Sequence, residues 1–497
     1  MKSKLLCLMI VATLWTAPAV AAKPKAIVLF YADDLGYGDT SAYGQNKVPT
    51  PNLERLASEG VRFCDAHSAT PICTPSRYSL LTGRYAFRRP DTRILDGDAK
   101  LILPVEGGDE RDVTLPVLMK RAGYRTATIG KWHLGLGAGE TPVNWNGEIK
   151  PSPREVGFDK SFVMAATADR VPCVFIEDGR VVGLEEDDPI EVCYDNTERK
   201  WDDEVTAHTN PELLKEWGRP SDRQHDKTIV DGISRIGHMR GGKEALWKDQ
   251  DLADRITSEA EKFIRESEGR PIFLFFATND IHVPRDPAPR FRGKSALGIR
   301  GDATVQMDDC LGRIRSALAS AGYEDTLFIF TSDNGPRVAD GYEDGAKEAW
   351  AGDNPAAPFS GGKYTVREGG TRIPMIVAWP GHVKPGTKSN ALVSQTDFAR
   401  SLAKIAGVDV PEGACSDSKE LSYVILGESE NGRESLVEQP AWGPWGYRKG
   451  PWKLIDTKKP QLYFLDDDPA ERNDLADENP GKVAELRAEL RSLVHGK

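Results

Sequence analysis

The stretch Ala26-Ile27-Val28-Leu29-Phe30-Tyr31-Ala32-Asp33-Asp34 decides the fold. An unbroken apolar run of this length is typical of a strand in a parallel sheet covered on both faces, whereas a half-exposed strand alternates apolar and polar residues. Three further runs have the same form and end in polar residues: 126–129 before Lys131 and His133, 272–276 before Asn279, Asp280 and His282, and 327–330 before Asp333, Asn334 and Gly335. The sequence therefore predicts an α/β fold with a large, mixed, mostly parallel sheet.

Helical patterns separate these runs and are expected to sandwich the sheet. The clearest of them lie at 50–56, 115–122 and 397–406. In open α/β sheets, ligands bind beyond the carboxyl ends of the strands. Because four runs place carboxylate, amide, lysine and histidine side chains at that edge, we expect a single polar site there.

The last part of the chain has a different pattern. Residues 375–379 are predicted to be one more core strand, whereas 447–455 and 462–465 are predicted to be strands of a small antiparallel sheet. A final amphipathic helix places Val483, Leu486, Leu490 and Leu493 on one face. We expect a main α/β domain over 23–425 and a smaller C-terminal α+β subdomain over 426–497. The charged stretch 169–249 is expected to be an insertion of loops and short elements near the site.

Composition excludes some classes of protein. A chain of 497 residues, 39% of them hydrophobic, is long enough for a large core and is not disordered. Its 76 acidic residues exceed its 65 basic ones, which gives a net charge of −11. A nucleic-acid binder needs a basic face, so this balance argues against one.

The N-terminus has the pattern of a secretory signal peptide, which we predict over residues 1–22. Lys2 and Lys4 form a basic start, 5–15 are apolar, and 19–22 are small residues suited to cleavage. No later segment approaches the ~20 apolar residues that a membrane-spanning helix needs. The expectation is an exported protein, periplasmic or secreted, without a membrane span. The absence of any Asn-x-Ser/Thr acceptor favours a bacterial source.

Six cysteines follow the predicted signal peptide, in a compartment where cysteines tend to pair. Cys173 and Cys193 flank a stretch rich in glycine and acidic residues. A disulfide between these two is one alternative, and two free thiols are the other.

Two pairs of oxygen-bearing side chains are expected to meet at the sheet edge. Asp33 and Asp34 follow one strand, and Asp333 and Asn334 follow another. Three crowded carboxylates repel one another unless a cation neutralises them, and ligands without sulfur or imidazole select Ca²⁺ or Mg²⁺ over zinc. The alternative is that each pair only caps a neighbouring helix, since Asp and Asn are favoured there.

The segment Pro71-Ile72-Cys73-Thr74-Pro75-Ser76-Arg77 leads into a helix predicted over 76–83. A helix N-terminus favours anions, and Arg77 adds a positive charge one turn further on. This pattern indicates an activated cysteine or an anion pocket. A buried structural cysteine is the alternative.

Six ordered motifs resemble those of one known family, the formylglycine-dependent type I sulfatases of the alkaline phosphatase superfamily. The motifs are Asp33-Asp34-Leu35-Gly36-Tyr37-Gly38-Asp39, Cys73-Thr74-Pro75-Ser76-Arg77 followed by Leu81-Thr82-Gly83-Arg84, Gly130-Lys131-Trp132-His133-Leu134-Gly135, His282-Val283-Pro284, Ser332-Asp333-Asn334-Gly335, and Gly361-Gly362-Lys363 running to Glu368-Gly369-Gly370. The resemblance covers most of the chain and implies an alkaline phosphatase-like fold, with 23–425 as the catalytic domain.

The resemblance also implies roles for individual residues. In that family the cysteine is oxidised to formylglycine, whose hydrated aldehyde is the nucleophile. The calcium ligands would be Asp33, Asp34, Asp333, Asn334 and the modified Cys73. Arg77 and Lys131 would hold the formylglycine, and His133 would hydrogen-bond its second hydroxyl. His282 and Lys363 would contact the sulfate together with Lys131, with His282 placed to protonate the leaving alcohol. Thr167 and Asp169 align with a polar pair that assists formylglycine, with Thr in place of the more usual Ser.

One departure affects recognition of the substrate. Many relatives have a further histidine after the segment that corresponds to 282–284, whereas Arg285 and Asp286 follow here. We expect Arg285 to reach a hydroxyl or carboxylate of the substrate. Arg170, Arg337 and Trp350 are weaker candidates for the rim of the pocket.

The function that the resemblance implies is calcium- and formylglycine-dependent hydrolysis of a sulfate monoester on a carbohydrate. A charge of −13 after removal of the signal peptide opposes long-range attraction of a heavily sulfated polymer, so we expect exo-action on short oligosaccharides. A formylglycine-generating or anaerobic sulfatase-maturating enzyme would be a partner. The alternatives are a phosphodiesterase or phosphonate monoester hydrolase of the same superfamily, and an exported calcium-dependent glycan-binding protein without catalysis.

Overall fold

A ten-stranded mixed sheet forms the centre of the computed structural model, which describes residues 23–90, 92–139 and 142–495. The predicted signal peptide lies outside these residues. In spatial order the strands are β15 (Thr387–Ser389), β2 (Val61–Phe63), β14 (Met375–Ala378), β13 (Thr326–Ser332), β1 (Ala26–Ala32), β12 (Ile272–Ala277), β4 (Arg125–Lys131), β5 (Lys160–Met164), β6 (Phe175–Glu177) and β7 (Arg180–Val181).

The four runs predicted as buried strands are β1, β4, β12 and β13, and they lie side by side and parallel. All seven residues of β1 are buried, which fits its unbroken apolar sequence. The predicted strand at 375–379 is β14, which is antiparallel to both of its neighbours. The sheet is therefore mixed, with a parallel centre.

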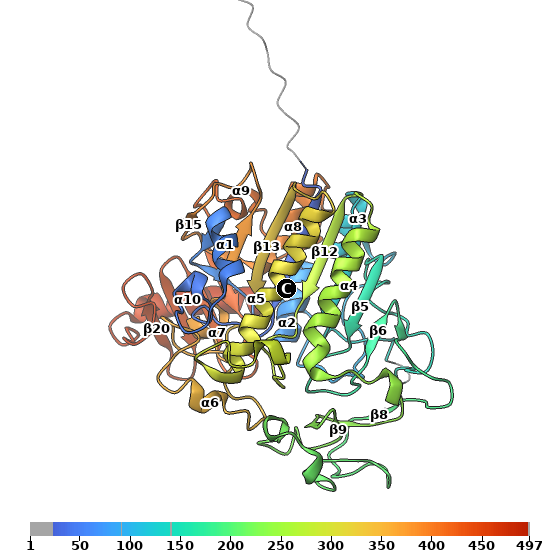
Figure 1. Cartoon of the computed structure of the whole chain (residues 1–497). Coiled ribbons are helices and arrows are strands. Elements are labelled where there is room, and N and C mark those ends of the chain that lie inside the picture. Colours follow the sequence, from blue (N-terminus) through green and yellow to red (C-terminus); the bar gives the residue numbers. More distant parts are fainter. Residues whose placement is uncertain (1–22, 91, 140–141, 496–497) are drawn as a thin grey trace, which may run out of the picture.

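Helices cover both faces of the sheet and make three layers (Figure 1). The α4–α5 pair and α1 pack together on one side, and α2, α3 and α8 pack together on the other. The helices are α1 (Pro51–Glu59), α2 (Cys73–Thr82), α3 (Leu115–Arg121), α4 (Leu252–Glu266), α5 (Gly298–Ser320), α6 (Ala346–Ala349), α7 (Glu368–Thr371), α8 (Phe398–Ala406), α9 (Ser422–Ile425) and α10 (Pro480–His495).

The register of the central strands brings the predicted site residues to one edge. Ala32 of β1 pairs with Ser332 of β13, so Asp33 and Asp333 leave neighbouring strands at the same level. Lys131 is the last residue of β4, and Gly130 pairs with Ala277, the last residue of β12. Four segments distant in sequence therefore end together.

The stretch 169–249 contains only short strands and single helical turns, as expected. Its strands beyond the main sheet are β8 (Glu191–Cys193), β9 (Ile229–Val230), β10 (Ile233–Ser234) and β11 (His238–Arg240). In the view of Figure 1, β8 and β9 lie below the sheet, past the ends of the central strands. Cys173 and Cys193 are both free thiols, so the alternative without a disulfide is the one observed.

The C-terminal part contains a four-stranded antiparallel sheet and the last helix. The strands are β17 (Ser435–Glu438), β18 (Trp445–Lys449), β19 (Trp452–Asp456) and β20 (Gln461–Phe464). Strand β17 was not predicted. Helix α10 packs on β18 and β19 and buries Val483, Leu486 and Leu490. Leu493 was expected on the same face but is 40% exposed, whereas the neighbouring Val494 packs against the C-terminal core in the last turn.

One short strand pair completes the fold. Strands β3 (Ala66–His67) and β16 (Val393–Ser394) pair in parallel.

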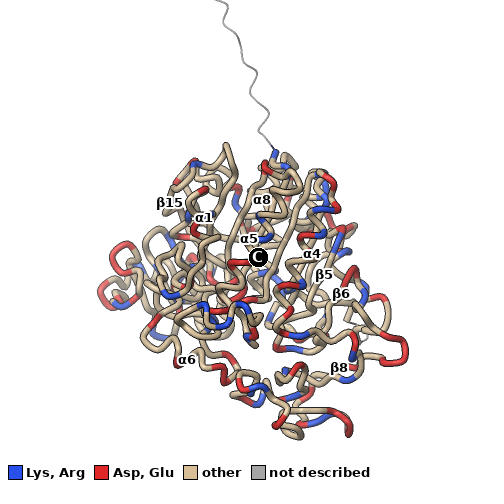
Figure 2. The backbone as a smooth tube through the Cα atoms, in the orientation of Figure 1, with Lys and Arg blue, Asp and Glu red and all other residues tan. Residues whose placement is uncertain are grey.

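No helix in the described residues has the length and apolarity to cross a lipid bilayer. Basic residues are interspersed with acidic ones along the backbone rather than gathered on one side (Figure 2).

Candidate active site

A cluster of three buried carboxylates lies at the carboxyl ends of β1 and β13. One oxygen atom from each of Asp33, Asp34 and Asp333 lies within 4.8 Å of the others, and none of the three residues is more than 1% exposed. Asn334 follows on the same turn and is also fully buried. The expected oxygen-rich set is therefore assembled in one place.

The backbone takes an unusual conformation at two site residues. Asp34 and His133 have φ angles of 57° and 56°, in the left-handed region that residues other than glycine seldom occupy. The amide of Asp34 is held by a hydrogen bond of 3.2 Å to Oδ1 of Asp333. Such conformations persist where the surrounding structure fixes them, and they concentrate at functional sites.

Three cations neutralise the three carboxylates. Lys131 Nζ lies 2.5 Å from Oδ2 of Asp33, and Lys363 Nζ lies 2.8 Å from Oδ2 of Asp34. Arg77 donates to Oδ2 of Asp333 from Nε at 3.1 Å and from Nη2 at 2.9 Å. Each carboxylate of the cluster is thus paired with one buried cation.

Two oxygen atoms in this cluster fit a metal ligand role. Oδ1 of Asp33 and Oδ1 of Asn334 are buried and have no hydrogen-bond partner within the described residues. The amide nitrogen of Asn334 donates to Asp34 at 2.7 Å, which orients Oδ1 of Asn334 away from that bond. Buried oxygens without a partner are costly, and a hard divalent cation such as Ca²⁺ would satisfy both. Burial also raises the pKa of Asp33 against the opposing effect of Lys131.

Cys73 is the first residue of α2, three residues before the predicted start of that helix. Its Sγ lies 3.3 Å from Nδ1 of His133. Burial raises the pKa of the Cys73 thiol although Lys131 and Lys363 oppose this. Burial and a raised pKa argue against a cysteine activated as a thiolate, and the anion pocket and the buried structural cysteine stay as the two other interpretations of this motif.

His133 presents an unprotonated nitrogen to residue 73. Its Nε2 lies 2.9 Å from the carbonyl oxygen of Leu95, which can only accept, so Nε2 carries the proton and Nδ1 is the acceptor. Burial, together with the nearby Lys131 and Arg170, holds the pKa of His133 well below its usual value. His133 is therefore a neutral base at this position.

His282 and Lys363 form another wall of the site. Nδ1 of His282 donates to the carbonyl oxygen of Val283 at 2.7 Å, which leaves Nε2 directed toward Asp34, 3.9 Å from its Oδ2. Burial and the nearby Lys363 hold the pKa of His282 well below its usual value. Lys363 also contacts Asp340, at 3.2 Å.

Thr167 and Asp169 occupy a neighbouring group of buried polar side chains. Thr167 donates to Asp169, and Arg170 Nη1 contacts Thr167 at 2.8 Å and Asp169 at 2.9 Å. Burial alone would raise the pKa of Asp169, but Arg170 and His225 hold it well below its usual value. Arg170 also lowers the pKa of His133, and His133 contacts Cys73. The group of Thr167, Asp169 and Arg170 therefore lies next to the position of the cysteine.

Arg285 differs from its expected role. Its guanidinium is buried and bonded to the protein itself, with 2.6 Å to Asp344 and 2.9–3.0 Å to the carbonyl oxygens of Arg337, Val338 and Ile281. Arg285 therefore fixes the loop 337–344 against the segment before His282 instead of reaching toward a substrate. Trp350 also differs, because it is buried in the core, where its ring lies 4.8 Å from the guanidinium carbon of Arg300.

Three residues of the site were not predicted. Asp340 contacts Lys363, Tyr364 contacts Asp340 with its hydroxyl at 3.3 Å, and His225 lies 3.4 Å from Asp169. Asp340 and His225 lie in irregular loops, where no local pattern marks them. Tyr364 follows Lys363 directly, and its adjacency to a site residue was the one available signal.

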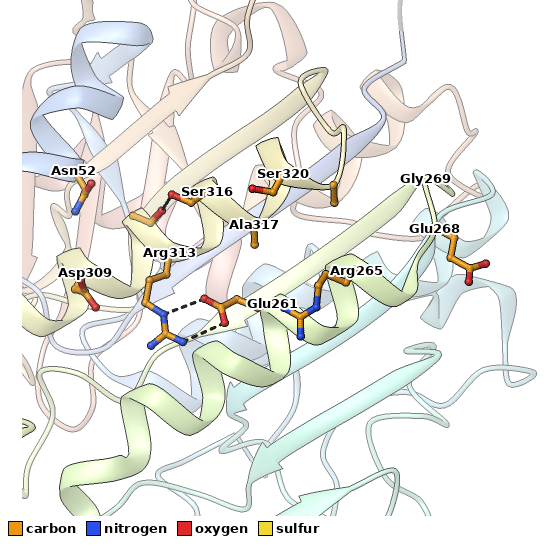
Figure 3. A pocket seen from close by; sticks show the side chains of 12 residues that line it. Asn52, Glu261, Arg265, Glu268, Gly269, Asp309, Arg313, Ser316, Ala317 and Ser320 are labelled. Carbon is orange, nitrogen blue, oxygen red and sulfur yellow. Dashed lines mark hydrogen bonds and ion pairs between the residues drawn. The ribbon is translucent and has the colours of Figure 1, made fainter.

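A large surface pocket lies elsewhere. It has a volume of about 770 Å³ and is lined by residues of α4 and α5, among them Glu261, Arg265 and Arg313 (Figure 3). The Arg313–Glu261 ion pair crosses it at 3.0 Å. None of the site residues lines this pocket.

Comparison with known proteins agrees with the fold and the site. The family model described as "Sulfatase" matches residues 25–408, and the one described as "N-sulphoglucosamine sulphohydrolase, C-terminal" matches residues 362–496. The chain belongs to the sulfatase family and has the alkaline phosphatase-like fold. It is a sulfuric ester hydrolase.

Individual relatives are similar to this chain over nearly its whole length. An N-acetylgalactosamine-6-O-sulfatase of Bacteroides thetaiotaomicron is 46% identical over 489 residues, which cover 95% of this chain and 93% of the relative. Human arylsulfatase A is 29% identical over 96% of this chain and 88% of its own. A solved structure, described under metabolism of multiple glycosaminoglycans by Bacteroides thetaiotaomicron, has a TM-score of 0.90 and 45% identity, covering 95% of this chain and 99% of that one.

Proposed function

We propose that this protein hydrolyses the 6-O-sulfate ester of an N-acetylgalactosamine residue in a sulfated oligosaccharide, using a formylglycine formed from Cys73 and a bound calcium ion. The observation that carries the proposal is the convergence of Cys73 with three buried carboxylates, three cations and two neutral histidines at one sheet edge. The similarity to an N-acetylgalactosamine-6-O-sulfatase supports the choice of substrate.

The cation would be held by Asp33, Asp34, Asp333, Asn334 and the side chain at position 73. What a calcium ion supplies in such a site is positive charge against the sulfate oxygens. The buried oxygens of Asp33 and Asn334 that lack partners support this ligand set. Arg77 keeps Asp333 oriented and also donates to the carbonyl oxygen of Lys131 at 3.0 Å, so it links α2 to the ends of β13 and β4.

The formylglycine would be held at the first residue of α2. When hydrated, an aldehyde there supplies one hydroxyl for attack on sulfur and a second that lets the sulfate be released without attack of water on sulfur. The raised pKa of the Cys73 thiol supports conversion, because an unmodified thiol would stay protonated and be a poor nucleophile.

The two histidines would move protons at opposite ends of the sulfate. Nδ1 of His133 is unprotonated and faces residue 73, so it can take a proton from a hydroxyl there. Nε2 of His282 is the free nitrogen on the other wall. The negative charge of a bound sulfate ester would oppose the effect of Lys363 and favour a proton on His282, which the leaving alcohol then receives.

Lys131 and Lys363 would bind the sulfate oxygens directly. Each is fully or nearly fully buried, and each now contacts a carboxylate of the cluster. Fixed cations in a site shielded from water stabilise developing negative charge by several kcal/mol without reorganisation. Because the chain has a net negative charge, its overall charge would not attract the sulfate ester. The local cations Lys131 and Lys363 would do so instead.

Release of sulfate from defined sugars tests this function. Matured protein is incubated with N-acetylgalactosamine 6-sulfate, its 4-sulfate isomer and 6-sulfated disaccharides, and free sulfate is measured. We expect turnover of the 6-sulfates and at least about a hundredfold preference over the 4-sulfate. Preference for aryl phosphate or phosphonate esters over aryl sulfate would contradict the proposal in favour of a phosphoester hydrolase. Sugar binding without any turnover would indicate a glycan-binding protein.

The protein would reach its substrate after export and maturation. We propose that residues 1–22 direct export to the periplasm or beyond, and that a formylglycine-generating or anaerobic sulfatase-maturating enzyme converts Cys73. Determination of the N-terminus of the exported protein tests the first step, with a start at residue 23 expected. A retained residue 2 in exported protein would contradict it.

A further inference from the structure

One aromatic side chain next to the site is far more exposed than the rest. Trp442 is 68% exposed, the highest value among the large exposed hydrophobic residues of the described chain. It lies in the loop between β17 and β18, in the C-terminal part of the molecule. A single exposed apolar residue needs no explanation by itself. What makes Trp442 informative is the residue that it contacts.

Trp442 lies against Tyr364, the neighbour of Lys363. Their ring centroids are 5.4 Å apart with an interplanar angle of 30°. Tyr364 has a φ angle of 76°, a left-handed conformation that is rare for an aromatic residue. This conformation lets Lys363 point to Asp34 while the next side chain faces Trp442. Backbone strain of this kind is kept where a function requires it.

Both aromatic residues are anchored to the segment that precedes Cys73. The amide of Tyr364 donates to the carbonyl oxygen of Pro71 at 2.8 Å, and the amide of Gln439 donates to that of Ala69 at 2.9 Å. Gln439 begins the loop that carries Trp442. Two loops from different parts of the chain are thus fixed two to four residues before the nucleophile position, which places the aromatic pair beside the sulfate pocket.

Polar groups flank this aromatic pair. Arg337, whose side chain is 48% exposed, has its guanidinium carbon 5.6 Å from the centre of the Tyr364 ring. Asp340 accepts from the Tyr364 hydroxyl at 3.3 Å. The surface therefore combines the exposed Trp442 side chain, which rests on a partly buried Tyr364, with a cation and a carboxylate. A pyranose has an apolar C–H face and a hydroxyl rim, and an oligosaccharide with anionic groups adds negative charge, so the two surfaces are complementary.

We propose that Trp442, supported from behind by Tyr364, forms a sugar-binding subsite, on which a pyranose ring of the sulfated oligosaccharide stacks through its apolar face, with Arg337 contacting an anionic group of the same oligosaccharide. The inference rests on the proposed function, since it needs a sulfated sugar in the pocket. It also gives the C-terminal subdomain a direct part in substrate binding.

Kinetics of Trp442 variants on two ligands test the subsite. The first ligand is a 6-sulfated N-acetylgalactosamine disaccharide, and the second is inorganic sulfate as a competitive inhibitor, which has no sugar ring. For Trp442→Ala we expect KM for the disaccharide to rise about tenfold, with kcat and the Ki of inorganic sulfate within about twofold of wild type. Trp442→Phe, which keeps a ring, is expected to recover most of the loss.

Tyr423→Ala is the matched control. Tyr423 is 62% exposed on α9, and the glycine that follows this helix packs on Val61, at the opposite end of the sheet from the site. We expect this variant to keep the wild-type KM. An unchanged KM in Trp442→Ala would overturn the subsite, and so would a parallel rise in the Ki of inorganic sulfate. Failure of the proposed function is distinguishable, because the wild type would then release no sulfate from any of the sugars.

Discussion

Lys453 of strand β19 donates a hydrogen bond of 2.8 Å to Glu368, the first residue of α7, and both side chains are fully buried. Glu438 lies 2.9 Å from the same ammonium. Glu368 is only five residues from Lys363. The C-terminal sheet is therefore joined by a buried ion pair to the loop that carries Lys363, the lysine proposed to bind sulfate.

Replacement of Lys453 by methionine is expected to destabilise the protein strongly. The substitution removes the buried ammonium that Glu368 and Glu438 share, and within the described residues only Glu368 keeps an arginine partner, Arg372 at 2.9 Å. Breaking a buried ion pair in this way costs about 3–5 kcal/mol. Thermal and denaturant unfolding measure the change. Lys459→Met is the control, because that side chain is 80% exposed and its loss should change the free energy of unfolding by less than about 0.5 kcal/mol. Equal stability of the two variants would contradict this role.

Calcium is expected to stabilise the folded protein. A ligand that binds only the folded state at a hundred times its Kd adds about 2.7 kcal/mol, so the Tm should rise with added Ca²⁺ and fall with a chelator. Asp333→Asn should lose most of this response, whereas Asp353→Asn, which removes a surface ion pair with Lys47, should keep it. A Tm that is insensitive to Ca²⁺ and Mg²⁺ would contradict the metal site.

The stability contribution of His225 is expected to depend on pH. Burial would lower the pKa of His225, but its bonds to Asp169 and Asp222 raise it to about 9. A group whose pKa is raised on folding stabilises fully below its unfolded value, near 6.5, and this effect is lost as pH rises through 9. The difference in the free energy of unfolding between wild type and His225→Gln should thus be largest at pH 6, at up to about 3 kcal/mol, and small at pH 10. If the difference in the free energy of unfolding did not change with pH, His225 would not be protonated in the folded protein.

Cys73→Ala is expected to abolish turnover and leave the fold intact. The side chain is small and lies at the first turn of α2, so its loss removes the nucleophile with little change in packing. We expect a decrease in kcat of at least about a thousandfold, with circular dichroism and the calcium-dependent Tm largely retained. Cys193→Ser, at a partly exposed thiol in the insertion, is the control and should keep its activity. Turnover close to wild type in Cys73→Ala would refute the nucleophile assignment.

The sequence predicted those features that depend on local pattern. The apolar run of β1 indicated a doubly covered parallel strand, and the polar residues after four such runs indicated one site at the carboxyl edge. Asp33 and Asp333 do meet there, because Ala32 and Ser332 are in register. That argument needs only strand periodicity and the rule that parallel strands end at one edge.

Other features depend on tertiary contacts and could not be predicted in that way. The predicted start of α2 at residue 76 was late, because proline is tolerated in the first turn of a helix and Pro75 therefore did not mark its boundary. Arg285 follows a site motif, yet its guanidinium is bonded to Asp344 and three carbonyl oxygens that come from distant loops. Trp442 lies nearly eighty residues from Tyr364 in the sequence, and only the fold brings the two rings together.

The chemical state of residue 73 is the most direct test of the central claim. Protein produced together with a sulfatase-maturating enzyme is digested, and the mass of the peptide that contains residue 73 is measured alongside sulfate release from a 6-sulfated sugar. We predict an aldehyde at this position. The fraction of molecules that carry it should rise and fall with the specific activity when different preparations are compared. Full activity in a preparation whose residue 73 is an unmodified thiol would contradict the account.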